Sequence, residues 1–418
     1  MSICLQHPSA ILSSSITLPT SKSISNRVLI IRHILHQQFT ISGLSTAADT
    51  QILKQVFEQN NNSIEVGHAG TTMRFLTAYF AATEGKNVVL SGSERMHQRP
   101  IKILVEALKT LGADIQYLNN EGFPPLQIKG KKLNGGAINL DGSVSSQYIS
   151  ALLLIAPLLK TELTITFTIP PVSKPYILMT ISVMCYFGVE VTWLSENQLV
   201  VKQGNYVAKD FSVEADWSAA SYWYSMVALS KNATIVLKGL DKTSLQGDNA
   251  VVALYTELGV NTRFIDGGIE LSKSKIPISW KMKTVDFTLF PDLAQTYAVT
   301  CAALNLPVRI TGLSTLRIKE TDRIAALQQE LNALGYQVTI EGHDLIIHQQ
   351  KEINIQQHSI FTYNDHRMAM AFAPLALITD KLTIENHEVV EKSYPHFWKD
   401  LKHLGFVIKN HQEESSSR

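Results

Sequence analysis

The sequence repeats at a regular spacing, and this repeat restricts the possible folds more than any other feature. Five segments with apolar residues at helical spacing end in Leu or Phe followed by glycine, the residue expected where a helix stops in the left-handed conformation. The glycines lie 76, 71, 76 and 70 residues apart: Gly112, Gly188, Gly259, Gly335 and Gly405. This spacing indicates one structural unit copied along the chain.

A second series of helices begins between these glycines. These helices are rich in small and apolar residues and carry few charges on any face, so we expect them to be buried. Their starts lie 76, 72, 76 and 72 residues apart, at Gly70, Ser146, Ser218, Ala294 and His366. An earlier copy covers residues 23–34. The pattern predicts six units, each with one buried helix, one amphipathic helix and several short strands.

Six units divide into two domains of three, each an α/β domain with its helices inside its sheets. At 418 residues the chain exceeds the length that one core normally supports, which also favours two domains. We place the N-terminal-half domain at residues 21–215 and the C-terminal-half domain at residues 216–418 together with residues 1–20. The first strand, residues 11–18, is expected to return to the second half of the chain.

Composition excludes several classes of protein. A net charge of +1 gives no overall attraction to nucleic acid or to a membrane surface, so an anion site must come from local clusters of Lys and Arg. The longest apolar run, residues 151–159, is too short to span a bilayer, and the first residues lack the basic region of a signal peptide. Cys4, Cys185 and Cys301 lie far apart, which argues against a disulfide framework or a zinc site and favours the reducing cytoplasm. We expect disorder only in residues 411–418.

Cations gather at the predicted helix starts. A helix N-terminus offers free N–H groups and the positive end of a dipole, which suit phosphate and carboxylate ligands. Capping needs only one Ser, Thr, Asp or Asn, yet several starts also carry a cation: Lys22, Arg27, Arg99, Arg323, Arg367 and Lys392. A cation there opposes the dipole unless an anion lies between them. We therefore predict an anionic ligand, and interpret residues 216–218 and 246–248 as plain capping motifs.

Residues 317–323 are the most charged of these predicted helix starts. Five of their seven side chains are charged, and an amphipathic helix follows directly. In isolation such a segment is most often a solvated helix start, with Thr321 or Asp322 as N-cap and a local pair between Glu320 and Arg323. Its place in the fifth unit indicates that it is one of several helix starts directed at a shared anionic ligand.

Nine motifs resemble, in order, those of the 5-enolpyruvylshikimate 3-phosphate synthases, the 3-phosphoshikimate 1-carboxyvinyltransferases of aromatic amino-acid biosynthesis. They are SKSISNR (21–27), HAGTTMR (68–74), RMHQRP (95–100), DGSVSSQ (141–147), SKPY (173–176), PD (291–292), KETDR (319–323), NDHRMAM (364–370) and EKSYP (391–395). Each motif is weak alone, but nine in order over nearly the whole chain are specific. The resemblance implies two inside-out α/β domains, each of three βαβαββ repeats, that close on a central cleft.

The family reaction belongs to the shikimate pathway towards chorismate: the enolpyruvyl group of phosphoenolpyruvate is transferred to the 5-hydroxyl of shikimate 3-phosphate, and phosphate is released. The two substrates carry roughly six negative charges, which requires Lys, Arg and helix N-termini around them. The resemblance implies that shikimate 3-phosphate is bound by Lys22, Ser23, Arg27, Ser145, Ser146, Gln147, Ser173, Tyr176, Asp292 and Lys319. It implies that phosphoenolpyruvate is bound by Lys22, Gly70, Arg99, Gln147, Arg323, Arg367 and Lys392.

The reaction needs a base for the hydroxyl group and an acid for the methylene carbon, followed by reversal of the carbon step to expel phosphate. By resemblance we assign Asp292 as the base, Glu320 as the acid at carbon and Lys22 as a proton shuttle. Lys319 and Arg323 favour the charged form of Glu320, so an acid role requires a bound anion or burial. The resemblance implies no metal or organic cofactor, and family members are usually monomers.

Some positions depart from the family pattern. His68 stands where the family commonly has Asn, and Phe75 where Pro often follows the Arg. We expect the approach to the enolpyruvyl site to be altered, and hypothesise a changed response to glyphosate, the usual inhibitor of the family. The sequence assigns no definite role to Arg74, Arg317 or His366.

Two alternatives remain open. The sister enolpyruvyl transferase acting on UDP-N-acetylglucosamine typically has a reactive Cys before the Arg-Pro helix start, whereas residues 91–99 contain none. It also has Asn where this chain has Ser23. The other alternative is a catalytically inactive protein that binds a phosphorylated metabolite on the same scaffold. Such a protein would not need Lys22, Asp292 and Glu320 beside its binding cations.

Overall fold

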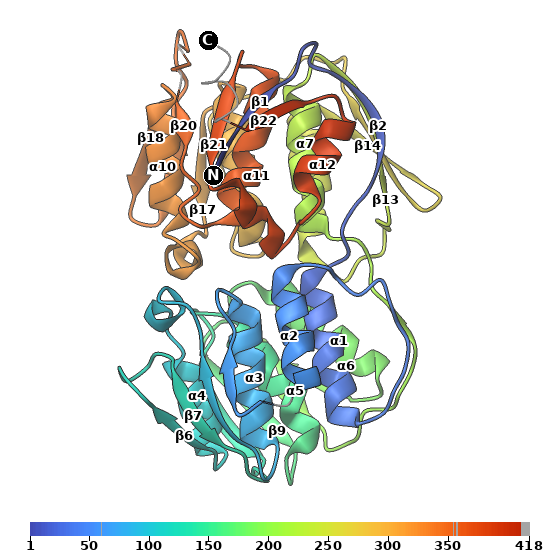
Figure 1. The fold of residues 1–418 in the computed structure, drawn as a ribbon, viewed down its shortest axis with the longest axis vertical. Coiled ribbons are helices and arrows are strands. Elements are labelled where there is room, and N and C mark those ends of the chain that lie inside the picture. The colour runs from blue at the N-terminus through green and yellow to red at the C-terminus, as the bar shows by residue number, and fades with distance from the viewer. Residues whose placement is uncertain (60, 354, 357, 411–418) are drawn as a thin grey trace. The chain divides into compact units, whose positions relative to one another are not determined.

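The computed structural model describes residues 1–59, 61–353, 355–356 and 358–410, so the expectation for residues 411–418 lies outside the described residues. The chain forms two compact units (Figure 1). We call Thr20–Val213 the N-unit, and Met1–Pro19 with Glu214–Arg418 the C-unit. Each unit has its own buried hydrophobic core.

Over its described residues, the N-unit consists of helices that pack on one another and three sheets. The helices are α1 (Lys22–Leu35), α2 (Ala48–Gln59), α3 (Gly70–Ala82), α4 (Lys102–Thr110), α5 (Ser146–Ile155) and α6 (Lys174–Tyr186), with the short 3-10 helices η1 (Met96–Gln98) and η2 (Ala156–Leu158). The first sheet has the order β4 (Ser63–Glu65), β5 (Asn87–Ser91), β7 (Leu126–Lys129), β6 (Asp114–Tyr117). The second has the order β10 (Val191–Ser195), β11 (Gln198–Val201), β9 (Leu163–Ile169), β8 (Gly136–Asp141), and the third pairs β12 (Phe211–Ser212) with β3 (Ile41–Ser42).

The part of the C-unit that the structure describes also has three sheets. Their orders are β20 (Ser359–Ile360), β21 (Leu382–Glu385), β1 (Ser2–Gln6), β22 (Val407–Asn410); then β14 (Val260–Ile265), β15 (Gly268–Lys273), β13 (Asn232–Lys238), β2 (Ile11–Thr17); then β16 (Lys283–Asp286), β17 (Val308–Thr311), β19 (Asp344–Ile347), β18 (Val338–Glu341). The helices are α7 (Trp217–Leu229), α8 (Val251–Thr256), α9 (Ala294–Ala303), α10 (Arg323–Ala333), α11 (His366–Phe372) and α12 (Phe397–His403). The 3-10 helices are η3 (Gly247–Ala250), η4 (Pro291–Leu293), η5 (Ser314–Ile318), η6 (Ala373–Leu377) and η7 (His387–Lys392).

Two strands from the start of the chain complete sheets of the C-unit. β2 pairs in parallel with β13, with Ile11 opposite Asn232 and Thr17 opposite Lys238. This is the return to the second half expected for residues 11–18. β1, which the sequence did not predict, pairs antiparallel with both β21 and β22.

The repeat glycines lie where the helices stop. All five have a positive φ, between 79° and 98°, a conformation that costs glycine little and other residues more. The predicted helix stops at Gly112, Gly188, Gly259, Gly335 and Gly405 are therefore confirmed.

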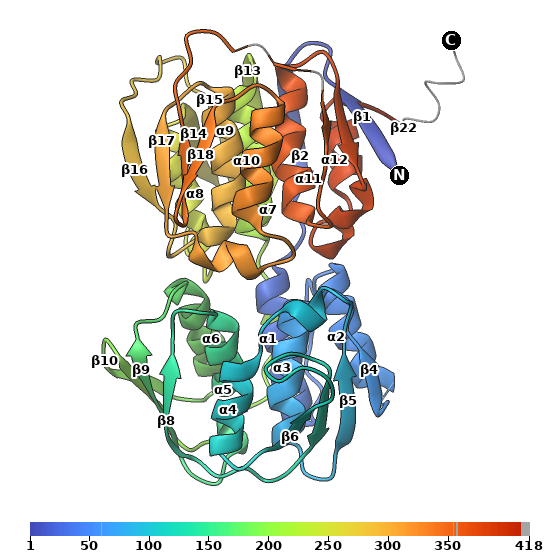
Figure 2. The ribbon, with the colours of Figure 1, turned by 90° about the vertical axis from the view of Figure 1, so that its left-hand side faces the viewer.

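The charge-poor helices are buried, as predicted. Every residue of α11 is buried, and in α5 every residue except Gln147. Figure 2 shows α7, α9, α10 and α11 side by side within the C-unit, with strands at its outside. α5 and α11 end at Ile155 and Phe372 and continue as η2 and η6, because Pro157 and Pro374 lack the N–H group that an α-helical turn needs. Over the described residues, no helix has the length and apolarity to cross a membrane.

Candidate active site

The start of α1 places Lys22 beside a buried acid. Ser21 caps the helix by accepting the N–H of Ile24. Lys22 Nζ lies 3.1 Å from Asp49 Oδ2, and Asp49, on α2, is 3% exposed. Sequence reasoning missed Asp49, because its partner is 27 residues away and only the fold brings the two together.

Arg27 is a buried cation surrounded by neutral groups. Its guanidinium is 2% exposed and lies 5.5 Å from the centre of the Phe75 ring. It donates to two hydroxyl and two carbonyl oxygens: Thr180 Oγ1 at 2.7 Å, Ser23 O at 2.6 Å, and Ser150 Oγ and Tyr176 O at 3.2 Å. Among the described residues it forms no ion pair with a carboxylate. Burial lowers the pKa of Arg27 to about 10, so this position favours an anionic ligand as the missing partner.

The predicted serines lie at the starts of α5 and α6. Ser145 caps α5 by accepting the N–H of Gln147, and the Gln147 side chain donates to Thr71 Oγ1 at 3.1 Å. Ser146 is buried in the first turn. Ser173 has a φ of 53°, which is uncommon for a residue with a side chain and is often found at functional sites.

A close contact joins Gly70 and Arg99. A Cβ atom on Gly70 would lie 2.6 Å from Arg99 Nη1, so glycine lets the guanidinium pack against the start of α3. Arg74 is 3% exposed and donates to Gly70 O at 3.3 Å and to Pro100 O at 2.9 Å. Arg74 therefore connects the helix start to the segment that carries Arg99.

In the C-unit, Arg323 is enclosed by acids at the start of α10. Its side chain is 2% exposed. It forms three ion pairs, with Asp365 Oδ2 at 2.7 Å, Glu320 Oε2 at 2.9 Å and Asp292 Oδ1 at 3.1 Å. Burial lowers the pKa of Arg323, but these three carboxylates more than offset it and hold the pKa above its ordinary value. Asp322 is the N-cap, accepting the N–H groups of Ile324 and Ala325.

Cations and acids alternate along this part of the C-unit. Lys392 Nζ lies 2.5 Å from Glu320 Oε1, and Glu320 in turn contacts Arg323. Asp292 lies between Arg323 and Arg367, whose Nη2 is 2.9 Å from Asp292 Oδ2. Each of the two candidate catalytic acids of this unit therefore contacts two of the cations expected to bind phosphoenolpyruvate.

The flanking residues support this arrangement. Lys319 follows η5 directly and is half-buried. Arg317 lies 2.8 Å from Asp322 Oδ2 and also donates to Gly342 O, so it stabilises the segment around the N-cap. His366 is 2% exposed, with Nδ1 3.6 Å from Asp365 Oδ1.

The capping interpretation of residues 246–248 is wrong. The side chain of Gln246 makes no capping bond to η3; it accepts the Trp217 N–H at 3.1 Å and donates to Ala215 O at 2.7 Å. Asp248 accepts a hydrogen bond from the Ser218 hydroxyl instead. Both side chains form hydrogen bonds with the start of α7. These contacts are long-range in sequence, so the local pattern could not predict them. The capping interpretation of residues 216–218 is confirmed, since Asp216 caps α7.

The predicted site residues thus fall into an N-unit group and a C-unit group. The N-unit group is Lys22, Ser23, Arg27, Gly70, Arg99, Ser145, Ser146, Gln147, Ser173 and Tyr176. The C-unit group is Asp292, Lys319, Glu320, Arg323, Arg367 and Lys392. Among the described residues, no group of three His, Cys, Asp or Glu side chains could hold a metal ion.

Comparisons with known proteins agree with one another. Residues 51–401 match the family model described as EPSP synthase (3-phosphoshikimate 1-carboxyvinyltransferase). A Bacteroides fragilis strain YCH46 protein named 3-phosphoshikimate 1-carboxyvinyltransferase is 48% identical over 415 residues, covering 99% of this chain and 100% of that protein. A protein of the same name from Aliivibrio fischeri strain ES114 is 36% identical over 431 residues, covering 96% and 99%. The solved structure of EPSP synthase from Acinetobacter baumannii shares the mixed α/β fold, with a TM-score of 0.76 and 22% identity over 98% of this chain and 100% of that chain.

Proposed function

Because this chain belongs to the EPSP synthase family, we propose that it transfers the enolpyruvyl group of phosphoenolpyruvate to the 5-hydroxyl of shikimate 3-phosphate and releases phosphate. It is a transferase of the shikimate pathway of aromatic amino-acid biosynthesis. The observation that carries this function is the full-length similarity to proteins of that name, 48% identical over 99% of the chain. Neither comparison with named relatives favours UDP-N-acetylglucosamine as acceptor.

We propose that the N-unit group holds shikimate 3-phosphate. Arg27 supports this because it is a buried cation without an acidic partner among the described residues, and a phosphate or carboxylate supplies that partner. The remaining contacts are proposed to come from Lys22, Ser23, Ser145, Ser146, Gln147, Ser173 and Tyr176, with Asp292 and Lys319 from the C-unit.

We propose that phosphoenolpyruvate is held by cations of both units. The proposed ligands are Lys22, Gly70, Arg99, Gln147, Arg323, Arg367 and Lys392. The contact between Gly70 and the Arg99 guanidinium supports this, because it places a cation at a helix start where an anion has both a charge and a dipole to bind.

The ion pairs of Glu320 in the C-unit indicate how substrate binding can change its protonation. An anion that binds Lys392 and Arg323 competes for the hydrogen bonds that Glu320 accepts. Weaker ion pairs favour the protonated form of a carboxyl group. Substrate binding would therefore give Glu320 the proton that an acid at carbon requires.

Three residues are proposed to move the protons of this reaction. The 5-hydroxyl oxygen bonds to C2 of phosphoenolpyruvate and loses its proton to Asp292, while Glu320 protonates the methylene carbon to a methyl group. Glu320 then removes a methyl proton as the C2–O bond to phosphate breaks. Lys22, held by Asp49, is proposed to pass a proton to the departing phosphate. No metal or organic cofactor takes part in this scheme.

Phosphate release from phosphoenolpyruvate tests the function. We expect release with shikimate 3-phosphate, and none with UDP-N-acetylglucosamine or without an acceptor. The Glu320→Gln variant, prepared identically, controls for contaminating phosphatase. Release with UDP-N-acetylglucosamine would favour the sister transferase, and no release with either acceptor would favour a protein that only binds phosphorylated metabolites.

We also propose that the chain acts as a monomer in the cytoplasm, without nucleic acid or membrane partners, and that the N-unit and C-unit are its two domains. The three sheets found among the described residues of each unit support that division. Light scattering during size-exclusion chromatography tests the oligomeric state, and a mass of twice 46.4 kDa would contradict it.

The altered response to glyphosate stays a hypothesis. His68 is exposed, with Nδ1 3.0 Å from Ser93 Oγ, and Phe75 lies under Arg27. The His68→Asn variant restores the common family residue. We expect it to differ from the unchanged chain in a glyphosate titration against phosphoenolpyruvate, and identical inhibition would contradict the hypothesis.

A further inference from the structure

Asp248 is a buried carboxyl group that the proposed reaction does not use. Its side chain is 3% exposed, and it lies in η3, just before α8. Its Oδ1 atom has no hydrogen-bond partner among the described residues. A buried carboxylate with an unsatisfied oxygen is unfavourable, so the position needs a physical reason.

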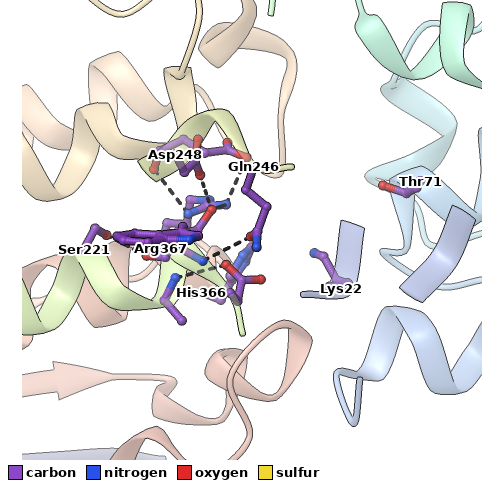
Figure 3. A network of polar contacts seen from close by, with 12 residues as sticks. Lys22, Thr71, Ser221, Gln246, Asp248, His366 and Arg367 are labelled. Carbon is purple, nitrogen blue, oxygen red and sulfur yellow. Dashed lines mark hydrogen bonds and ion pairs between the residues drawn. The ribbon is translucent and has the colours of Figure 1, made fainter. Parts of the chain in front are cut away.

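One hydroxyl group connects Asp248 to Arg367. Ser218 Oγ donates to Asp248 Oδ2, and Arg367 Nη2 donates to the same Ser218 Oγ at 3.4 Å. A hydroxyl has one proton to donate, so donating it to Asp248 leaves the oxygen free to accept from Arg367. Figure 3 shows Asp248 and Arg367 close to each other. The contact joins the starts of α7 and α11 to η3.

The charged groups around Asp248 come from three other elements. Asp292 belongs to η4, Arg367 to α11, and Asp216 is the N-cap of α7. Burial and then the charge of Asp292 raise the pKa of Asp248 to about 7, although Arg367 and the Ser218 hydroxyl act in the opposite direction. The carboxyl group is therefore partly protonated near neutral pH.

We propose that Asp248 is a positioning residue for Arg367, which it holds through Ser218, and that its carboxyl group takes up a proton when the anionic substrate binds Arg367. The inference rests on the proposed function, which supplies that anion. The proton comes from water and is taken up by Oδ1, the oxygen without a partner. A neutral Asp248 removes one negative charge that would otherwise oppose phosphoenolpyruvate at Arg367.

The Asp248→Asn variant tests this directly. Asn cannot be charged, yet its side-chain oxygen can still accept the Ser218 hydroxyl, so it imitates the protonated acid. We expect it to bind phosphoenolpyruvate, with shikimate 3-phosphate present, about tenfold tighter than the unchanged chain at pH 8, about twofold tighter at pH 7 and equally at pH 6. Calorimetry in two buffers of different ionisation enthalpy should show less proton uptake in the variant at pH 7.

Weaker binding by Asp248→Asn at pH 8, or unchanged proton uptake, would overturn the inference, since a purely structural role predicts weaker binding at every pH. If the unchanged chain releases no phosphate with shikimate 3-phosphate, the proposed function fails instead. Asp241→Asn is the matched control, because Asp241 is an exposed acid of the same unit, and it should behave like the unchanged chain.

The bridge itself is tested by Ser218→Ala. We expect phosphoenolpyruvate to bind about tenfold more weakly at every pH, since a hydrogen bond to a charged group is lost. Binding of shikimate 3-phosphate alone should stay unchanged. Wild-type affinity for phosphoenolpyruvate in Ser218→Ala would show that Asp248 does not act through this hydroxyl.

Discussion

Arg27 in the N-unit and Arg323 in the C-unit are equally buried, each 2% exposed, but their surroundings differ. Arg27 donates to hydroxyl and carbonyl oxygens, and burial lowers its pKa. Arg323 contacts three carboxylates, which hold its pKa above the ordinary value. A buried cation among neutral groups is ready for an anion, whereas a buried cation among acids is already neutralised.

This difference suggests that the N-unit group and the C-unit group have different roles in substrate binding. The N-unit group can bind the anionic acceptor without displacing any acid from Arg27. Under the proposed function, the C-unit group exchanges its carboxylate contacts with Glu320 for substrate contacts, and Glu320 is the acid assigned to proton transfer at carbon. We therefore propose that binding and proton transfer are coupled in the C-unit.

The largest expected effect comes from substituting Glu320, one of the acids that contact the cations of the C-unit. Glu320→Gln keeps the size of the side chain but cannot donate a carboxyl proton to carbon. We expect kcat to fall by about 10²- to 10⁴-fold, with the affinity for both substrates largely retained. Steady-state kinetics and direct binding measurements check this. An equal loss of affinity and kcat would make Glu320 an organiser of Lys392 and Arg323 rather than an acid.

The next largest effect is a difference in stability between variants of the two arginines. Arg323→Met leaves Asp365 buried without its cation, so we expect a loss of about 3–5 kcal/mol in the free energy of unfolding. Arg27→Met leaves no acid unpaired but removes four hydrogen bonds to oxygen atoms, so we expect a smaller loss of about 1–3 kcal/mol. Denaturant titration of both variants gives the comparison.

Ligand binding by Arg27→Met provides the matching control. It should fold as the unchanged chain does and lose affinity for shikimate 3-phosphate. Equal destabilisation by the two substitutions would remove the difference between the units on which the account depends.

The ionisation of Asp248 should make the free energy of unfolding depend on pH. Its pKa is about 7 in the fold against an ordinary value of 3.8, so the folded chain binds more protons between these values. The free energy of unfolding then falls as pH rises from about 4 to about 7, by at most about 1.4 kcal/mol per pH unit, and is constant in this respect above pH 7. As pH rises from about 4 to about 7, the free energy of unfolding of Asp248→Asn should therefore rise relative to that of the unchanged chain. A constant difference from pH 4 to pH 8 would show that Asp248 does not titrate there.

The smallest effect concerns the helix start beside the acids. Asp322→Ala removes the cap of α10 and should cost about 1 kcal/mol, whereas Asp322→Asn retains an accepting oxygen and should cost a few tenths. Thermal unfolding of the pair checks this. If Asn proves as destabilising as Ala, the contribution of Asp322 comes from its ion pair with Arg317 and not from the cap.

Local rules predicted much of the fold from the sequence. The glycine stops, the buried helices and the caps Asp216 and Asp322 each depend on a few neighbouring residues. The residue sets of the site came from motif resemblance, and they stay predictions as to their roles.

The partners of the charged side chains could not be predicted, because they are far apart in sequence. Asp365 is 42 residues from Arg323, and Asp248 is 30 residues from Ser218. Only the packing of the repeats brings them together. The motif around Asp248 contained an acid next to a glycine, but nothing local distinguished a buried carboxyl group from a helix cap.

The most direct test of the account is a calorimetric titration of the unchanged chain with each substrate alone. We predict that shikimate 3-phosphate binds without phosphoenolpyruvate. Phosphoenolpyruvate alone should bind at least about tenfold more weakly than shikimate 3-phosphate alone, since its cations in the C-unit are occupied by Glu320 and Asp292, whereas Arg27 has no carboxylate to displace among the described residues. Equally tight binding of the two substrates, each measured alone, would contradict the proposed difference between the two units.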